Sequence, residues 1–144
     1  MHEKTRPPAG GSEAGAEKDT YHHGNLREAL LAAATAIIDE KGLDGLSLRA
    51  CAARAGVSHA APAHHFANLR GLLTALGTIA FRRFHARIAA EQARAGGTAI
   101  ERLRAAAHGY VGFAVSNPGL FRLMFSASLL DWEDAELGAA AGAA

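Results

Sequence analysis

The stretch 46–66 constrains the fold most strongly, because its pattern predicts a helix, a tight turn and a second helix. Ser47 is a capping residue, and the apolar side chains after it recur at i, i+3, i+4 and i+7, which predicts a helix of about two turns. Gly56 ends this helix, because glycine adopts positive φ without a Cβ clash. Ser58 is predicted to cap the second helix, which ends at 64–66. This pattern is that of a helix-turn-helix, whose second helix can lie in the major groove of DNA.

The charged residues are distributed unevenly along the chain. Residues 21–90 carry eight basic and four acidic side chains, and the stretch 46–70 contains no acid. From residue 91 onward the balance reverses, with four arginines and six acids. The basic half therefore contains the helix-turn-helix, as binding to phosphate requires, although solvation of an exposed surface alone would also explain the excess.

The composition and apolar spacing predict an all-α chain, because alanine is abundant and apolar residues recur at helical intervals. A first helix is expected from Asn25, as N-cap, to about Lys41, and it shares a core with the two motif helices. That predicted core consists of Leu30, Ile37, Leu48, Ala52, Val57 and Phe66. A long helix then runs from Leu69 to the glycine pair 96–97, either as a passive strut or as a connector that transmits motion between the two halves. The expected architecture is a three-helix DNA-binding unit joined by this long helix to a partial helical regulatory domain.

Three regions follow from this pattern. Residues 1–20 contain almost nothing apolar and are predicted to form a disordered tail. Residues 21–68 are predicted to form the helix-turn-helix domain, and 69–144 a partial ligand-binding and dimerisation domain. In this last region Thr98 and Glu101 fit a capping box, and the candidates for a ligand pocket are Phe84, Tyr110, Phe113, Phe121, Met124 and Phe125. Aromatic residues at helical spacing are also typical of an ordinary core.

Several classes of protein lack support in the sequence. Cys51 is the only cysteine, which excludes an intramolecular disulfide and favours a small core residue in a reducing compartment. We find no secretory signal and no membrane span, so a cytoplasmic protein is expected. The adjacent histidine pairs 22–23 and 64–65 point to different helix faces, and no catalytic or nucleotide-binding motif is present. We therefore expect no enzyme, no metal site and no cofactor.

The motifs together resemble the TetR family of bacterial transcriptional regulators. The resemblance covers about residues 21–76 and rests on Tyr21-His22-His23-Gly24-Asn25-Leu26-Arg27, on Glu40-Lys41-Gly42, on Ser47-Leu48-Arg49, on Ala55-Gly56-Val57-Ser58 and on His65-Phe66. The later run Asn117-Pro118-Gly119-Leu120-Phe121-Arg122-Leu123-Met124-Phe125 resembles the start of the ligand-binding half in one branch of the family. The resemblance implies a homodimeric, ligand-responsive repressor that binds a palindromic operator in double-stranded DNA. It also implies release from DNA when a small-molecule inducer, whose identity the sequence does not give, occupies the C-terminal half.

The family's DNA-contacting positions can be placed on this sequence. The backbone-contacting positions correspond to Ser47 and Ser58, whose hydroxyls and nearby helix amides are donors to phosphate. The base-reading positions correspond to His59, Ala60, Ala61 and His64. Histidine can donate or accept at a base edge, and alanine can contact a thymine methyl group.

The chain departs from the family pattern at several points. Ala63 stands where most members have a phosphate-binding tyrosine, and Leu69 where they have a lysine, with Arg70 as a possible replacement. Pro62 removes one backbone donor from the recognition helix. Family members also continue through two more long helices that form the dimer interface, so homodimerisation requires those helices. The alternative is therefore a helical ligand-binding or protein-binding module whose DNA binding is impaired by truncation.

Overall fold

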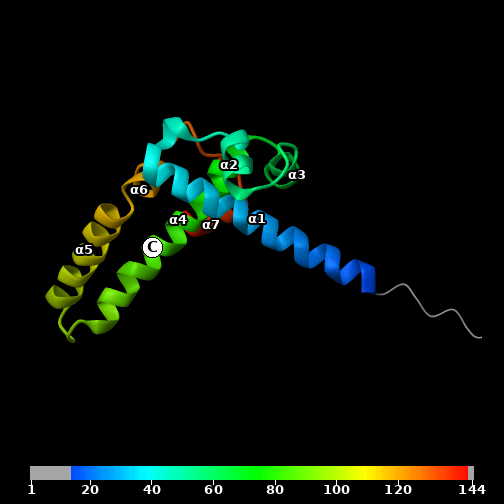
Figure 1. Ribbon diagram of the computed structural model, residues 1–144. Coiled ribbons are helices and arrows are strands. Elements are labelled where there is room, and N and C mark those ends of the chain that lie inside the picture. The colour runs from blue at the N-terminus through cyan, green and yellow to red at the C-terminus, as the bar shows by residue number, and fades with distance from the viewer. Residues whose placement is uncertain (1–13, 143–144) are drawn as a thin grey trace, which may run out of the picture.

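The computed structural model describes residues 14–142, and the side chains of residues 25–142. Every regular element in that range is helical, which confirms the predicted all-α fold. The elements are α1 (Ala14–Lys41), the 3-10 turn η1 (Leu43–Gly45), α2 (Leu48–Ala55), α3 (Ala61–Phe66), α4 (Leu69–Arg94), α5 (Ala99–Ser116), α6 (Pro118–Met124) and α7 (Ala135–Ala141). Figure 1 shows α2 and α3 gathered beside α1, while α4 and α5 form a two-helix arm that projects away from them.

The first helix differs from its predicted bounds. It begins at Ala14 and passes through Asn25, so the expected N-cap at Asn25 is wrong. Residues 14–20, which were expected to be disordered, are helical, whereas residues 1–13 of the predicted tail lie outside the described residues. Alanine, glutamate and lysine in this segment have high helix propensity. Adding turns to an existing helix is also less costly than nucleating one, which explains the extension.

The three N-terminal helices share a core that the apolar spacing predicted. Leu30 and Ile37 of α1 are buried together with Ala52 of α2 and Phe66 of α3. Cys51 is also completely buried, and burial raises the pKa of its thiol. The expected role of Cys51 as a small core residue is therefore confirmed, while the predicted core members Leu48 and Val57 are partly buried against the same cluster.

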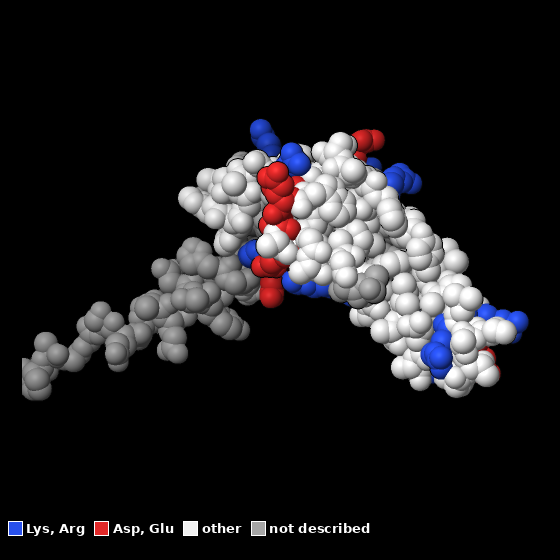
Figure 2. Space-filling view, turned by 180° about the vertical axis from the view of Figure 1, so that it is seen from behind, with Lys and Arg blue, Asp and Glu red and all other residues white. Residues whose placement is uncertain are grey.

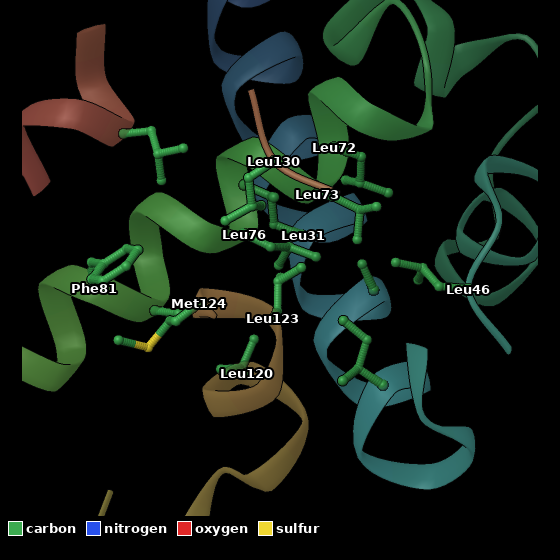
Figure 3. Close-up of a cluster of buried hydrophobic side chains, with 14 of the residues drawn as sticks. Leu31, Leu46, Leu72, Leu73, Leu76, Phe81, Leu120, Leu123, Met124 and Leu130 are labelled. Carbon is green, nitrogen blue, oxygen red and sulfur yellow. The ribbon is translucent and has the colours of Figure 1, made fainter. Parts of the chain in front are cut away.

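The short helix α6 joins this core to the C-terminal half. Figure 3 shows Leu123 of α6 directed toward Leu76 of α4 and Leu31 of α1, while Met124 extends toward Phe81 of α4. A Cβ atom added at Gly119 would lie 2.2 Å from Cγ2 of Ile38, so the start of α6 approaches α1 closely. One continuous core therefore runs from α1 through α4 to α6.

Helix α5 packs on an unexpected side. Leu103, Tyr110 and Val111 recur at helical spacing and would form one apolar face of α5, but Leu103 is 70% exposed and Val111 is 57% exposed. The packed side instead contains Gly109, where an added Cβ would lie 2.8 Å from Cα of Ile88 on α4. The missing side chain lets the two helix backbones approach closely, so α4 covers the glycine side of α5.

The helix ends of the C-terminal half are capped in different ways. Thr98 and Glu101 form the predicted capping box at the start of α5. The side chain of Asn117 does not cap α6 and instead donates to the Phe113 carbonyl at 3.2 Å. At the start of α7, Asp134 accepts a hydrogen bond from the Leu137 amide at 2.8 Å. None of the described helices combines the length and the apolar character that crossing a membrane needs.

Candidate nucleic-acid interface

The first motif helix is capped as the sequence predicts. The Oγ of Ser47 accepts a hydrogen bond from the Ala50 amide at 3.0 Å, and the side chain is exposed. The cap uses the hydroxyl only as an acceptor. The hydroxyl proton of Ser47 therefore remains available for donation to a phosphate oxygen.

The turn after α2 depends on glycine. Gly56 adopts φ 69° and ψ 30°, in the left-handed region, and its amide donates to the carbonyl groups of Ala52 and Ala53. The Val57 amide donates to the Ala52 carbonyl at 3.0 Å, and its side chain packs partly against the core. This arrangement confirms Gly56 as the end of the first motif helix, and Val57 anchors the bend.

The second motif helix begins later than expected. Its N-cap is Ala60, with no side-chain cap, so the assignment of the cap to Ser58 is wrong. If Ser58 were the N-cap, its carbonyl would accept from the amide of residue 62, which is proline and has no N–H. The chain instead forms a turn in which the Ala61 amide donates to the Ser58 carbonyl at 3.1 Å.

The residues predicted to contact DNA lie on exposed parts of this motif, with one exception. Ser58, His59 and Ala60 are exposed in the turn, and His64 is exposed on α3, whereas Ala61 is only half-exposed. Pro62 and Phe66 face the core, so the outer surface of α3 is narrow and also includes Ala63. Four of the residues predicted to contact DNA are therefore exposed in the turn and on α3, namely Ser58, His59, Ala60 and His64.

Arg70 occupies a different setting from the other candidates. It lies near the start of α4, and its guanidinium donates to the Leu130 carbonyl at 2.8 Å. Leu130 is buried and lies between α6 and α7. A phosphate contact by Arg70 would have to coexist with this bond or replace it.

The comparisons with known proteins identify the motif. Residues 30–76 match the model of the bacterial regulatory proteins of the tetR family. The chain contains a TetR family helix-turn-helix domain. A similar solved structure is that of a protein with unknown function from Rhodococcus sp. RHA1, with 40% sequence identity and a TM-score of 0.74. The match covers 85% of this chain and 63% of that chain, so our chain spans less than two thirds of its length. No curated protein matches.

One arginine of α2 is paired with an acid of α1. The guanidinium of Arg54 on α2 donates to both carboxylate oxygens of Glu40 on α1, at 2.7 and 2.6 Å. This hydrogen bonding lowers the pKa of Glu40 and raises the pKa of Arg54. Arg54 therefore links α2 to α1, and the exposed Arg49 is the basic residue of α2 outside this pair.

Arg27 was not selected from the sequence, but it lies beside the recognition helix. Its Cζ atom is 5.4 Å from the ring centroid of Phe66, an arrangement typical of a cation–π contact. The two residues are far apart in the sequence, so no local pattern indicates the contact. Arg27 and His64 line the same cleft of about 590 Å³.

The structure also brings the predicted ligand-pocket residues together. Phe84 contacts Tyr110 and Phe113, with ring centroids 5.3 and 5.5 Å apart, and Phe121 lies 5.0 Å from Phe125. Phe84 and Phe113 are buried, as is Met124 of the same set, whereas Phe125 is 62% exposed. These rings therefore pack directly against one another. Of the set, Tyr110 also lines a shallow apolar groove of about 320 Å³ along α5.

Proposed function

We propose that this chain is a sequence-specific DNA-binding regulator that acts as a ligand-responsive repressor in the cytoplasm. The observation that carries the proposal is the exposed face of the α2–turn–α3 motif, where Ser47, Ser58 and His64 all face solvent. We also propose residues 21–68 as the DNA-binding domain and 69–144 as the partial regulatory domain. The TetR family helix-turn-helix domain supports DNA binding, and the finer roles below are proposals.

The proposed contacts divide into two groups. Ser47 and Ser58 would donate to phosphate and fix the position of the motif on the duplex. His59 and His64 would contact base edges, while Ala60 and the half-exposed Ala61 would contact thymine methyl groups. Because this surface carries few cationic groups, we expect affinity to fall only moderately with salt.

We further propose that two copies bind a palindromic operator and release it when a small molecule occupies the C-terminal half. One motif alone buries little surface, and a second half-site would double the contacts. The aromatic cluster around Phe84 and Tyr110 supports a small-molecule site, because a ligand could separate rings that now contact one another.

The deciding experiment is selection of bound sequences from a random duplex pool, followed by gel-shift titration at stated salt. His64→Ala should reduce the preference for the selected sequence over random DNA by about 1–3 kcal/mol. Arg70→Ala should weaken binding to both DNAs alike. Arg104→Gln, an exposed arginine on α5, is the matched control and should change neither affinity. Failure of the chain to enrich or shift any duplex would overturn the proposal.

A second candidate function is a helical module that binds another protein or a ligand with impaired DNA binding. The observation that favours it is the exposed apolar stripe of α5, with Leu103 70% exposed and Val115 75% exposed. Sedimentation of wild type and of Leu103→Gln in the absence of DNA would distinguish the two. Loss of self-association or ligand binding in the variant, together with no enrichment of DNA, would favour the module.

A further inference from the structure

A cleft lies at the boundary between the two halves of the chain. This cleft, of about 590 Å³, is lined by α1, α3, the first half of α4 and residues 131–136. Its volume lies in the range of small-molecule sites. It is separate from the aromatic cluster around Phe84, because none of those rings lines it.

The lining of the cleft carries charges of both signs. Arg27 and His64 line it from α1 and α3, and Asp131 and Asp134 line it from the segment that leads into α7. Figure 2 shows acidic side chains gathered in a column on one face of the molecule, with basic side chains beside its lower end. A ligand with only one sign of charge would therefore be repelled by part of the lining.

Some charged groups of the cleft are already engaged. Arg82 pairs with Glu136 at 3.4 Å, and Arg70 donates to the Leu130 carbonyl. The Thr74 hydroxyl accepts from the Asp131 amide at 3.0 Å, which fixes the start of the segment 131–136 against α4. These contacts attach residues 130–136 to α4.

Other groups keep free bonding capacity. The face of the Arg27 guanidinium lies over Phe66, and the described residues form no ion pair with it. Asp131 and Asp134 each accept one amide hydrogen bond through Oδ1, and within the described part of the chain nothing donates to Oδ2. The cleft therefore offers one planar cation and two partly free carboxylates.

From this arrangement we propose that the cleft binds a small zwitterion, with its anionic group on Arg27 and its ammonium group between Asp131 and Asp134. Arginine held on an aromatic ring presents its N–H groups in a fixed geometry that suits a carboxylate. The two aspartates supply acceptors for the three N–H donors of an ammonium group. His64 borders the same space, so a bound ligand would draw this side chain away from a base edge, a consequence that rests on the proposed function.

The test is a calorimetric titration of the 144-residue chain with 6-aminohexanoate, a zwitterion whose charges stand at the two ends of a flexible chain. Hexanoate and hexylammonium, at matched ionic strength, each lack one of the charges. We expect saturable binding of 6-aminohexanoate and binding of either control weaker by at least about tenfold, since one charged contact is lost. No saturable binding, or equal binding of hexanoate, would overturn the assignment.

Variants distinguish binding in the cleft from a general effect of net charge on ligand binding. Arg27→Gln and Asp131→Asn should each weaken 6-aminohexanoate binding about tenfold. Asp134→Asn should do the same, and asparagine keeps the N-cap of α7. Arg104→Gln changes the net charge by the same amount as Arg27→Gln but lies outside the cleft, and it should leave binding unchanged. Thermal unfolding of each variant checks that the fold is retained, and unaltered binding in a folded Arg27→Gln protein would refute the site.

A second titration, with DNA, tests whether ligand binding in the cleft is coupled to DNA binding. Addition of 6-aminohexanoate should weaken operator binding of wild type but not of Arg27→Gln. If no DNA is bound at all, the proposed function fails, while the DNA-free titration still decides the cleft. If DNA binding is unaffected by a zwitterion that does bind, the coupling to His64 is wrong.

Discussion

The α1–α3 unit and the α4–α5 arm are both built from amphipathic helices, but they use their apolar faces differently. In the first unit Leu30, Ile37 and Phe66 all turn inward and are buried. In the arm the contact is made through Gly109, while Leu103 remains exposed. Helical periodicity therefore identifies an apolar face, but it does not determine whether a partner covers that face.

The difference predicts opposite responses to shortening a leucine. Leu30→Ala in α1, at a side chain with 0% exposure, should reduce the free energy of unfolding by about 2–5 kcal/mol, because it removes buried surface and leaves a cavity. Leu103→Ala in α5, at 70% exposure, should change it by no more than about 0.5 kcal/mol. Urea unfolding followed by circular dichroism measures both. Similar losses would mean that the α5 face is covered in solution.

The two regions meet where α6 approaches α1, and a glycine makes that approach possible. A Cβ at Gly119 would lie 2.2 Å from Cγ2 of Ile38, so Gly119→Ala should destabilise the chain by about 1–3 kcal/mol. Gly138→Ala in α7 is the control, because nothing lies within 4 Å of the added atom. That change should stabilise the chain by up to about 1 kcal/mol through helix propensity.

A double-mutant cycle tests whether the destabilisation by Gly119→Ala comes from contact with Ile38. Ile38→Ala removes the atom that an alanine at position 119 would meet, so Gly119→Ala should cost less in that background than in wild type. The same denaturant measurement applies to all four proteins of the cycle. Strict additivity would show that α6 does not press on Ile38, and that the two regions are less closely coupled than the structure indicates.

The N-caps of α2 and α5 can be compared because removal of either cap should reduce stability by the same amount. Ser47→Ala at α2 and Thr98→Ala at α5 each remove a side-chain acceptor at a helix N-terminus and should each cost about 1 kcal/mol of stability. Only Ser47→Ala should also weaken DNA binding, because only Ser47 lies on the proposed interface. Thermal unfolding and gel-shift titration of both variants separate the two effects. Equal loss of DNA affinity in both would mean that stability alone governs binding.

Besides the core of α1, α2 and α3, the features that the sequence predicted correctly are fixed by short-range geometry. The cap at Ser47, the left-handed Gly56 and the box formed by Thr98 and Glu101 each involve residues within one turn of the chain. The start of α3 could also have been predicted from Pro62, because proline cannot donate the amide hydrogen bond that a cap at Ser58 requires.

The features that the sequence missed depend on contacts between distant segments. The exposed face of α5 follows from the close approach of Gly109 to Ile88. The apolar pattern of α5 alone does not show which side of the helix α4 will cover. The contact of Arg27 with Phe66 and the cleft beside it require α1, α3 and residues 131–136 to meet in space. The functional roles of Ser47, Ser58, His59, Ala60, Ala61, His64 and Arg70 remain predictions.

The smallest expected effect concerns pH and compares a carboxylate in each region. The hydrogen bond from Arg54 lowers the pKa of Glu40, and hydrogen bonds from Thr98 lower the pKa of Glu101. A carboxyl whose pKa is lower in the folded chain stabilises it above the unfolded value, near 4.5 here, and that contribution disappears as pH falls through the folded value. The Tm differences of Glu40→Gln and Glu101→Gln from wild type should therefore be largest at neutral pH and shrink below about pH 4.5. Both groups are exposed, so the differences should be smaller than those of the leucine and glycine variants.

Glu28→Gln, at an exposed carboxylate without an ion pair in the described part of the chain, should show no such pH dependence. If Glu28→Gln behaves like the other two, general charge repulsion, and not these two contacts, controls acid stability.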